Sequence, residues 1–211
     1  MKRLRLVLDV DGVVIRGRPD DGLPWHQTLR EDLGLDRDVL TDRFFNAGFL
    51  DALRGQADIR ELLEDLFSSL DAPTTVDAFI DYWFSHDARL NDDLIELTHE
   101  LRLRSGLRCF LANNQERHRT TYVWETLGLK KHFDAIVSSS DVGACKPEPE
   151  FFRRAQQRLE LTTDDQVLFV DDRETFVQAA QRHGWEAVRF RDNDDLRSRL
   201  RSWVADHEDE G

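Results

Sequence analysis

Short apolar segments alternate with segments of helical periodicity along most of this chain. The apolar segments have the length of strands and no regular polar face, as is typical of strands buried on both sides. They lie at residues 4–10, 107–111, 135–137, 167–170 and 186–190. Apolar residues spaced three or four apart predict helices between and after the later strands. These helices are expected at 92–105 (with Asn91 as N-cap), 116–127, 147–159, 173–183 and 196–204. The alternation predicts an α/β fold, a doubly wound, Rossmann-like parallel sheet covered on both faces.

The region after the first predicted strand breaks this alternation. Residues 16–88 contain no convincing strand, and glycines and a proline divide their helical periodicity into short helices. We therefore interpret 16–88 as an inserted helical cap on an α/β core made of 1–15 and 89–206, followed by a flexible tail at 207–211. The large aromatic residues of the cap are expected to form mostly its own core. They are Trp25, Phe44, Phe45, Phe49, Phe67, Trp83 and Phe84.

Composition limits the classes of protein to which the chain can belong. Its 211 residues carry 29 Lys and Arg against 42 Asp and Glu, a net charge of −13, with 40% hydrophobic residues. This length and apolar content predict one domain with an inserted subdomain rather than a disordered chain. The acidic balance argues against binding nucleic acid as the main function, but a metal ion can still supply positive charge for a small phosphorylated substrate.

Membrane, secretion and disulfide signals are weak. No apolar stretch reaches 18 residues, so no membrane span is expected. The apolar run 4–8 is too short for a signal-peptide core, and we expect a cytoplasmic protein. Cys109 and Cys145 are too few for a disulfide framework and lack a C-x-x-C spacing. Cys145 is expected to be a packed thiol rather than a redox switch.

Polar side chains that can carry chemistry follow the predicted strands. They are Asp9, Asp11, Asn113, Asn114, Asp171 and Asp172, with Lys146 in the loop after the third strand. Parallel strands bring their carboxyl ends to one edge of a sheet, where ligands bind in folds of this class. Carboxylates gathered at that edge would repel one another without a cation, and hard oxygen ligands suit Mg²⁺. The sequence therefore predicts a magnesium site there.

The acidic pairs at two of these strand ends differ in what they indicate. The spacing of Asp9 and Asp11 allows one carboxylate to act as a nucleophile while the other gives and takes protons, and Gly12 permits a sharp turn beside them. A solvated acidic turn would have the same sequence. Asp171 and Asp172 are a weaker signal, because acidic residues are also favourable at the start of a helix.

Lys146 stands out because lysine is rare in this chain. There are four lysines beside 25 arginines, so lysine is not the default cation. A compact ammonium can neutralise a phosphate or the charge of a nucleophile. An ordinary surface lysine before a helix is the simpler interpretation of this residue taken alone.

Four segments together resemble the motifs of a known family. They are residues 9–14, 111–115, 143–149 and 169–172, with the sequences DVDGVV, LANNQ, GACKPEP and FVDD. Their order and their positions at strand ends resemble the haloacid dehalogenase-like hydrolase superfamily, in the branch with a helical cap after the first strand. The resemblance covers roughly residues 4–204, and four ordered motifs are far more specific than one.

The resemblance implies a role for each matched residue. Asp9 would attack phosphorus and form an aspartyl-phosphate, and Asp11 would protonate the leaving group and then activate water. Mg²⁺ would be held by Asp9, the carbonyl oxygen of Asp11 and Asp172, with Asp171 assisting. Lys146 would stabilise the charge on Asp9 and bind the phosphoryl group. Members that cleave carbon–halogen bonds lack an acid at the position of Asp11, so the resemblance favours a phosphatase over a dehalogenase.

Two positions depart from the family pattern. Ser or Thr usually ends the second strand and binds a phosphoryl oxygen, whereas this chain has Ala112 or Asn113 there, depending on the alignment. The amide of Asn113 can donate a hydrogen bond instead, and Asn114 is counted with it as phosphate-binding. The second departure is Phe176, four residues beyond Asp172, at a position where relatives often carry Asn or Asp.

Phenylalanine cannot ligate a metal, and Glu174 or Asp141 are the nearby replacements. The sequence as a whole predicts a Mg²⁺-dependent phosphatase acting on a small phosphomonoester, with a sugar phosphate as the first candidate. The alternative is a catalytically weak or inactive domain of the same fold that binds a phosphorylated ligand or a protein partner. A receiver domain would be smaller than this chain. Substrate identity and oligomeric state are left open.

Overall fold

A central parallel sheet forms the middle layer of the protein. The computed structural model describes residues 3–208, and in this part of the chain one five-stranded sheet has the strand order β3-β2-β1-β4-β5. The strands are β1 (Arg3–Leu8), β2 (Arg108–Asn113), β3 (Ala135–Ser138), β4 (Asp165–Asp171) and β5 (Glu186–Arg189). Every neighbouring pair is parallel. The predicted Rossmann-like α/β class is confirmed, and the five apolar segments are the five strands.

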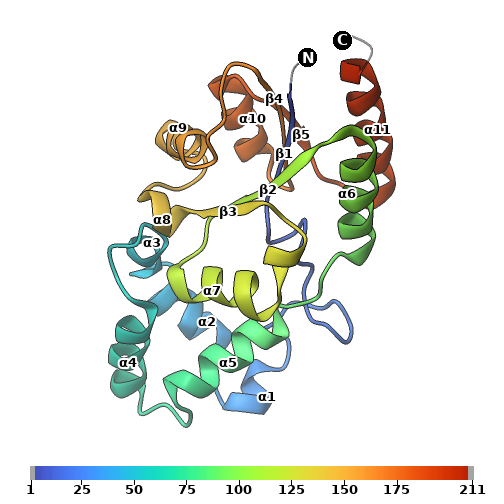
Figure 1. Ribbon diagram of the computed structural model, residues 1–211. Helices are drawn as coiled ribbons and strands as arrows, with labels where there is room; N and C mark the ends of the chain where they lie inside the picture. The colour runs from blue at the N-terminus through green and yellow to red at the C-terminus, as the bar shows by residue number, and fades with distance from the viewer. Residues whose placement is uncertain (1–2, 209–211) are drawn as a thin grey trace.

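Helices cover both faces of the sheet (Figure 1). On one face lie α9 (Pro149–Arg158) and α10 (Glu174–His183), and on the other lie α6 (Asp92–Ser105) and α11 (Asn193–Glu208). Alternate side chains of β1 enter two separate hydrophobic clusters: Leu4, Leu6 and Leu8 pack with α6 and α11, whereas Val7 packs with α9 and α10. Burial on both sides accounts for the apolar positions of this strand. On the face of Val7, Arg3 is exposed at the start of the strand, and Arg5 is buried with its Nε 2.9 Å from Asp165 Oδ1.

Several element boundaries differ from the prediction. The helix expected at 116–127 begins as α7 (Arg117–Thr121) and continues as the wider π-type turns of η2 (Tyr122–Thr126), before the 3₁₀ turn η3 (Leu129–Lys131). The last helix, α11, begins three residues before the predicted 196 and continues through Glu208. The helix includes the first two residues of the expected tail at 207–211, and 209–211 lie outside the described residues.

A short helix that the sequence analysis missed follows β3. This helix, α8 (Ser139–Val142), begins with a capping box between Ser138 and Asp141. The side chain of Asp141 accepts from the backbone N–H of Ser138, and its own backbone N–H donates to Ser138 Oγ. Four residues are too few to show helical periodicity, which is why the hydrophobic pattern did not reveal α8.

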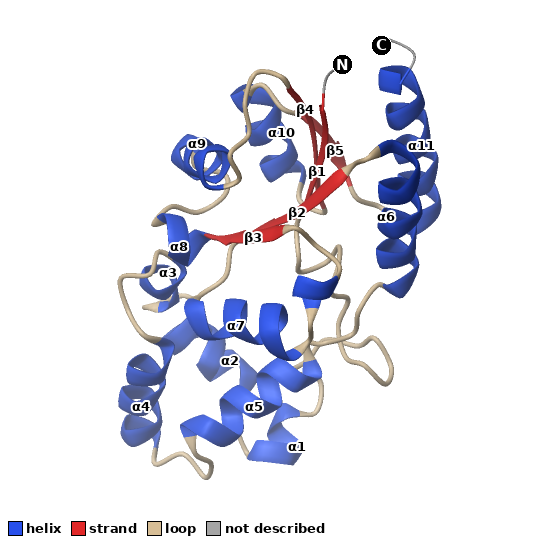
Figure 2. Cartoon of the chain, viewed as in Figure 1, coloured by secondary structure: helices blue, strands red, loops and turns tan. Residues whose placement is uncertain are grey.

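The region 16–88 is helical and has its own hydrophobic cluster (Figure 2). Its elements are α1 (Leu29–Leu33), α2 (Arg37–Leu40), the π-type η1 (Thr41–Phe45), α3 (Phe49–Leu53), α4 (Ile59–Leu70) and α5 (Val76–His86). All seven large aromatic residues named above belong to this cluster, and Trp25, Phe45 and Phe49 are its partly buried members. A cluster separate from those of the sheet supports the division into core and cap, which we retain as a proposal.

Two paired chain segments connect this helical region to the sheet. Ile15 and Leu90 form an antiparallel bridge, so the outgoing and returning segments lie side by side. Asn91, predicted as the N-cap of α6, makes no side-chain cap hydrogen bond. Its amide instead donates to the carbonyl oxygen of Val13 and to Asn193 Oδ1, both at 2.9 Å. Asn91 therefore ties the paired segments to the start of α11.

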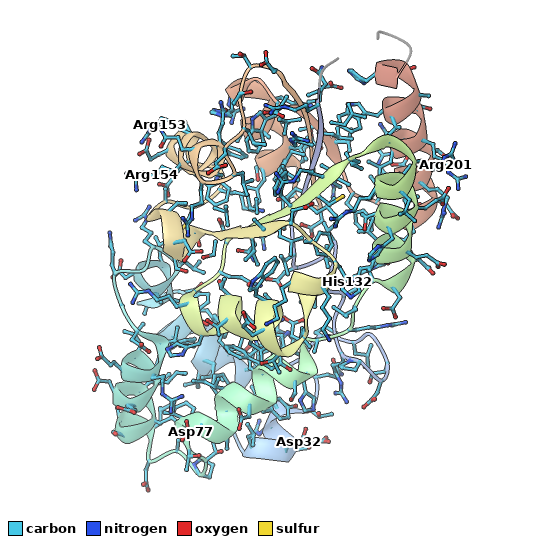
Figure 3. The ribbon with its side chains drawn as sticks, in the orientation of Figure 1. Asp32, Asp77, His132, Arg153, Arg154 and Arg201 are labelled. Carbon is cyan, nitrogen blue, oxygen red and sulfur yellow. The ribbon has the colours of Figure 1, made fainter. Side chains whose placement is uncertain are left out.

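The charged side chains labelled in Figure 3 lie on the periphery of the molecule. Arg153 and Arg154 extend from α9, Arg201 from α11, and Asp32 and Asp77 from the helical region. Within residues 3–208, no helix combines the length and apolar character that a membrane crossing requires.

Candidate active site

A buried lysine lies between two carboxylates at the carboxyl edge of the sheet. Asp9 directly follows β1, and its backbone N–H donates to Val170 O at 2.9 Å, which extends the pairing with β4. Asp171 ends β4 and is fully buried. Lys146 Nζ lies 2.8 Å from Asp9 Oδ1 and 2.6 Å from Asp171 Oδ2. The three side chains that the strand ends were predicted to bring together are therefore in contact.

Lys146 is not a surface lysine, because its side chain has no exposed area. An ammonium has three hydrogens to donate. Besides the two carboxylates, Nζ donates to the carbonyl oxygen of Ala112 at 3.0 Å. All three hydrogens thus have protein acceptors, and a phosphoryl oxygen would have to replace one of them. Direct phosphate binding by Lys146 stays a prediction, whereas its contact with Asp9 and Asp171 is present in the structure.

The buried charges shift one another's ionisation. Burial raises the pKa of the Asp9 carboxyl to about 7, and the ammonium of Lys146 acts in the opposite direction. Burial also acts to lower the pKa of Lys146, but the charges of Asp9 and Asp171 outweigh it and the pKa is raised. Lys146 therefore stays protonated. Further positive charge beside Asp9 would favour the ionised carboxylate that a nucleophile requires.

Three carboxylates at this edge are placed to share a cation. Asp9, Asp171 and Asp172 each offer an oxygen, and these atoms all lie within 4.8 Å of one another. Burial followed by the charge of Asp171 raises the pKa of Asp172, which records the repulsion among them. Gly12, at φ 85°, lies so close that a Cβ would be 2.6 Å from Asp172 Oδ2. An all-oxygen set of this kind fits Mg²⁺. The predicted ligand contributed by the carbonyl of Asp11 stays a prediction.

The side chain of Asp11 lies outside that carboxylate group and is held by residues the sequence analysis had not assigned. Gln115 Nε2 donates to Asp11 Oδ2 at 2.8 Å, and Arg119 Nη2 lies 3.8 Å from Asp11 Oδ1. Arg119 also lies 3.4 Å from Asp87, whose pKa is raised to about 6 by burial and by the charge of Asp11. Gln115 lies just before the predicted helix 116–127 and Arg119 lies within it, so helical spacing gives no signal that connects either residue with Asp11.

The two asparagines after β2 have partners within the protein. Asn113 is 1% exposed, and its Nδ2 donates to Gln115 Oε1 at 3.0 Å. Asn114 holds the backbone of Lys146 at both ends, accepting from its N–H at 2.8 Å and donating to its carbonyl oxygen at 2.9 Å. Their phosphate-binding roles stay predictions. The structure gives them the tasks of supporting Gln115 and of fixing the Lys146 loop.

Phe176 occupies the second departure from the family pattern. Its ring is buried, with Lys146 Nζ 5.1 Å from the ring centroid, a favourable cation–π contact. Neither proposed replacement joins the carboxylate cluster found among the described residues. Asp141 caps α8, and Glu174 is exposed and accepts from Gln178. Phe176 packs against the lysine rather than ligating a metal.

The helical region also reaches the core beside this site. A glycine-containing turn between α3 and α4, residues 54–58, packs on the segments that carry Gln115 and Lys146. The polar contacts are Arg54 Nη2 with Glu148 Oε1 (2.8 Å), Arg117 Nη2 with the carbonyl oxygen of Gly55 (2.9 Å) and His118 Nε2 with Asp58 Oδ1 (3.0 Å). The cap thus contacts the core next to the carboxylate cluster as well as through the paired segments.

Comparison with known proteins agrees with this arrangement. A family model described as haloacid dehalogenase-like hydrolase matches residues 5–184. Bifunctional epoxide hydrolase 2 of Sus scrofa is 25% identical over 209 residues, covering 89% of this chain and 36% of the relative. Phosphoglycolate phosphatase of Salmonella paratyphi A (strain ATCC 9150 / SARB42) is 33% identical over 84 residues, covering 40% of this chain and 33% of the relative. The chain spans about a third of the length of these curated relatives.

A solved structure shares the fold. A HAD family enzyme from Bacteroides thetaiotaomicron, in complex with magnesium and inorganic phosphate, superimposes with a TM-score of 0.70 at 17% identity. The match covers 90% of this chain and 94% of that one.

Proposed function

The chain belongs to the haloacid dehalogenase-like hydrolase family, and on this premise we propose that it is a Mg²⁺-dependent phosphatase acting on a small phosphomonoester through an aspartyl-phosphate. One observation carries the proposal. A buried lysine lies 2.8 Å from Asp9, a strand-end carboxylate, and a second acid, Asp11, follows two residues later. A carboxylate nucleophile beside a fixed positive charge and a separate acid–base group are the parts that this two-step hydrolysis requires.

In the first step an oxygen of Asp9 attacks phosphorus, and the bond from phosphorus to the leaving oxygen breaks. Asp11 donates its proton to that leaving oxygen, so an alcohol departs rather than an alkoxide. In the second step water attacks the phosphorus of the aspartyl-phosphate while Asp11, now a carboxylate, takes a proton from the water. The bond between Asp9 and phosphorus then breaks, which releases inorganic phosphate and restores both side chains.

The charged residues around Asp9 have supporting tasks in this proposal. Lys146 keeps a positive charge against Asp9 while the phosphoryl group is transferred. Asp9, Asp171 and Asp172 would hold Mg²⁺, which when bound supplies positive charge to the phosphoryl oxygens and reduces their repulsion by the carboxylates.

The substrate class follows from the acid and from the cap. A general acid assists departure of an alkoxide but is unnecessary for a halide, so Asp11 favours ester hydrolysis over dehalogenation. The helical cap beside the site suits a substrate small enough to be enclosed between cap and core. A sugar phosphate is our first candidate. The phosphoglycolate phosphatase that the chain resembles over 84 residues is named for a different small phosphomonoester, so it supports the class and not the sugar.

Screening the pure protein with Mg²⁺ against a panel of phosphomonoesters, by phosphate release, tests the proposal. We expect turnover of at least one sugar or hydroxy-acid phosphate, and loss of several orders of magnitude in Asp9→Asn, which has the same shape but no nucleophile. Asp65→Asn, an exposed aspartate on α4, is the matched control and should keep full activity.

Acid-quenched wild-type protein should carry phosphate on the peptide that contains Asp9. If Asp9→Asn retained more than about a tenth of wild-type turnover, the covalent mechanism would be wrong. Binding of phosphorylated ligands without any turnover would favour the non-catalytic alternative. The engagement of the Asn113 amide by Gln115 is the observation that keeps this alternative in view.

A further inference from the structure

The carboxylate of Asp11 is held in place although it lies at the surface. Its side chain is 49% exposed, whereas Gln115 and Arg119, which face its two oxygens, are each 3% exposed. Exposed aspartates ordinarily sample several rotamers, because water satisfies them equally well in each. Here a buried amide donates to Oδ2 at 2.8 Å, so one orientation of the carboxylate is selected. The mechanism above gives Gln115 no task.

The hydrogen-bond chain behind Asp11 defines the direction of each amide. Gln115 Nε2 donates to Asp11 Oδ2, which turns the Gln115 Oε1 away from Asp11. Asn113 must then turn its own NH₂ toward Gln115 Oε1, at 3.0 Å. This leaves Asn113 Oδ1 buried with no hydrogen-bond partner among the described residues. An unsatisfied buried oxygen is destabilising, so the protein retains this arrangement at the expense of stability.

Arg119 contributes charge on the other side of the carboxylate. At 3.8 Å from Oδ1 its Nη2 is beyond hydrogen-bond distance, and it donates instead to the carbonyl oxygen of Asp87. Its Nη1 donates to the carbonyl oxygen of Phe84 at 3.0 Å. The guanidinium is thereby attached to the end of the cap. Oδ1 of Asp11 has no donor at hydrogen-bond distance among the described residues, whereas Oδ2 is occupied.

We propose that Gln115, supported by Asn113, is a positioning residue for the acid–base group Asp11. It occupies Oδ2 with a donated hydrogen, so Oδ1 is the oxygen that carries the proton and exchanges it with the leaving group and then with water. This inference rests on the proposed phosphatase function. In this proposal the segment after β2 orients the oxygen of Asp11 that transfers the proton. That task is separate from binding the phosphoryl group.

If Gln115 positions Asp11, the effect of removing Gln115 on the rate should depend on the leaving group of the substrate. General acid catalysis contributes about 10²–10⁴ to the rate where the leaving oxygen needs a proton. An alkyl ester leaves as a strongly basic alkoxide and needs that proton, whereas p-nitrophenolate is stable without it. The ratio kcat/KM covers the steps up to the phosphoenzyme, so it reports the acid role of Asp11 and not its later role as a base.

The test compares glycerol phosphate with p-nitrophenyl phosphate in wild type and Gln115→Met, which keeps the length of the side chain and removes the donor. We expect kcat/KM to fall about 10- to 100-fold on the alkyl ester and less than about threefold on the aryl ester. Asn113→Leu, which leaves Gln115 in place without its support, should show the same selectivity with a smaller loss. Gln178→Met, an exposed glutamine on α10, is the matched control and should change neither value.

Thermal unfolding of each variant separates misfolding from mispositioning, because a folding defect lowers both ratios in parallel. Equal losses on the two esters, or no loss on either, in a folded Gln115→Met would overturn the positioning role and leave the phosphatase function standing. If wild type hydrolyses neither ester nor any other phosphomonoester, the proposed function fails and this inference fails with it. Selective loss on the alkyl ester in both variants supports the assignment.

Discussion

Replacing Lys146 with methionine should destabilise the protein more than any surface substitution. Methionine has similar length and fits an apolar environment, so the main change is removal of the charge. Asp9 and Asp171, with side chains 10% and 0% exposed, would lose the ammonium that lies 2.8 and 2.6 Å from them. Breaking a buried ion pair by removing one partner typically costs about 3–5 kcal/mol. The carbonyl oxygen of Ala112, which accepts the third hydrogen, also loses a donor. We therefore expect a loss of at least about 3 kcal/mol.

Urea unfolding in excess EDTA, followed by tryptophan fluorescence, measures this free energy of unfolding without a contribution from bound metal. The chain has five tryptophans to report the transition. Lys131→Met, at an exposed lysine, is the control and should change stability by less than about 0.5 kcal/mol. The double variant Lys146→Met/Asp171→Asn should be more stable than Lys146→Met, because residue 171 then carries no buried charge without a partner.

Two results would refute this reasoning. A loss below about 1 kcal/mol for Lys146→Met would mean that the buried ion pairs contribute little beyond the cost of desolvation. A double variant no more stable than Lys146→Met would mean that the loss comes from packing, since neutralising Asp171 would then bring no relief.

Three other expectations concern stability around the site. Mg²⁺ added to EDTA-treated protein should raise the melting temperature, because Asp9, Asp171 and Asp172 lie together only in the folded protein. A thermal scan without a shift would contradict the metal site. Arg119→Met should lower the free energy of unfolding, measured in urea, by about 2–4 kcal/mol, because a buried guanidinium with carbonyl and carboxylate partners is lost. An unfolding free energy equal to that of wild type within error would refute this. Burial raises the pKa of Asp87 to about 6, so its ionised form opposes folding above that pH. Asp87→Asn should therefore raise the melting temperature at about pH 8. The gain should shrink toward about pH 4, where Asp87 of the wild type is protonated. A gain in melting temperature that does not depend on pH would be inconsistent with this.

The fold and the central part of the site were accessible from the sequence because they depend on local patterns. The apolar segments mark the strands, and apolar side chains on both faces over most of each segment indicate burial on both sides. Once the strands are parallel, their carboxyl ends must meet at one edge, so the meeting of Asp9 with Asp171 follows from topology. The contact of Lys146 with both agrees with the family motif that contains it.

The surroundings of the site were decided by tertiary structure. Gln115 reaches Asp11 across 104 positions of the chain, and Arg119 joins the same carboxylate to the end of the cap. Asn91, expected to cap a helix, bonds instead to the segment after β1, and the Asn114 side chain is bound to the backbone of Lys146. None of these partners can be identified from spacing, since each joins segments that are distant in sequence.

The difference has a physical cause. A hydrophobic period records which face of an element is buried. The hydrophobic effect is non-directional, so this burial can be recognised without knowing the partner. A polar side chain has many equivalent partners, including water, and its choice depends on where the loops lie to within a few tenths of an ångström. That placement comes from packing the cap and both faces of the sheet together. The chain thus specifies its strands and its strand-end carboxylates locally, whereas only the folded molecule determines which amide orients Asp11.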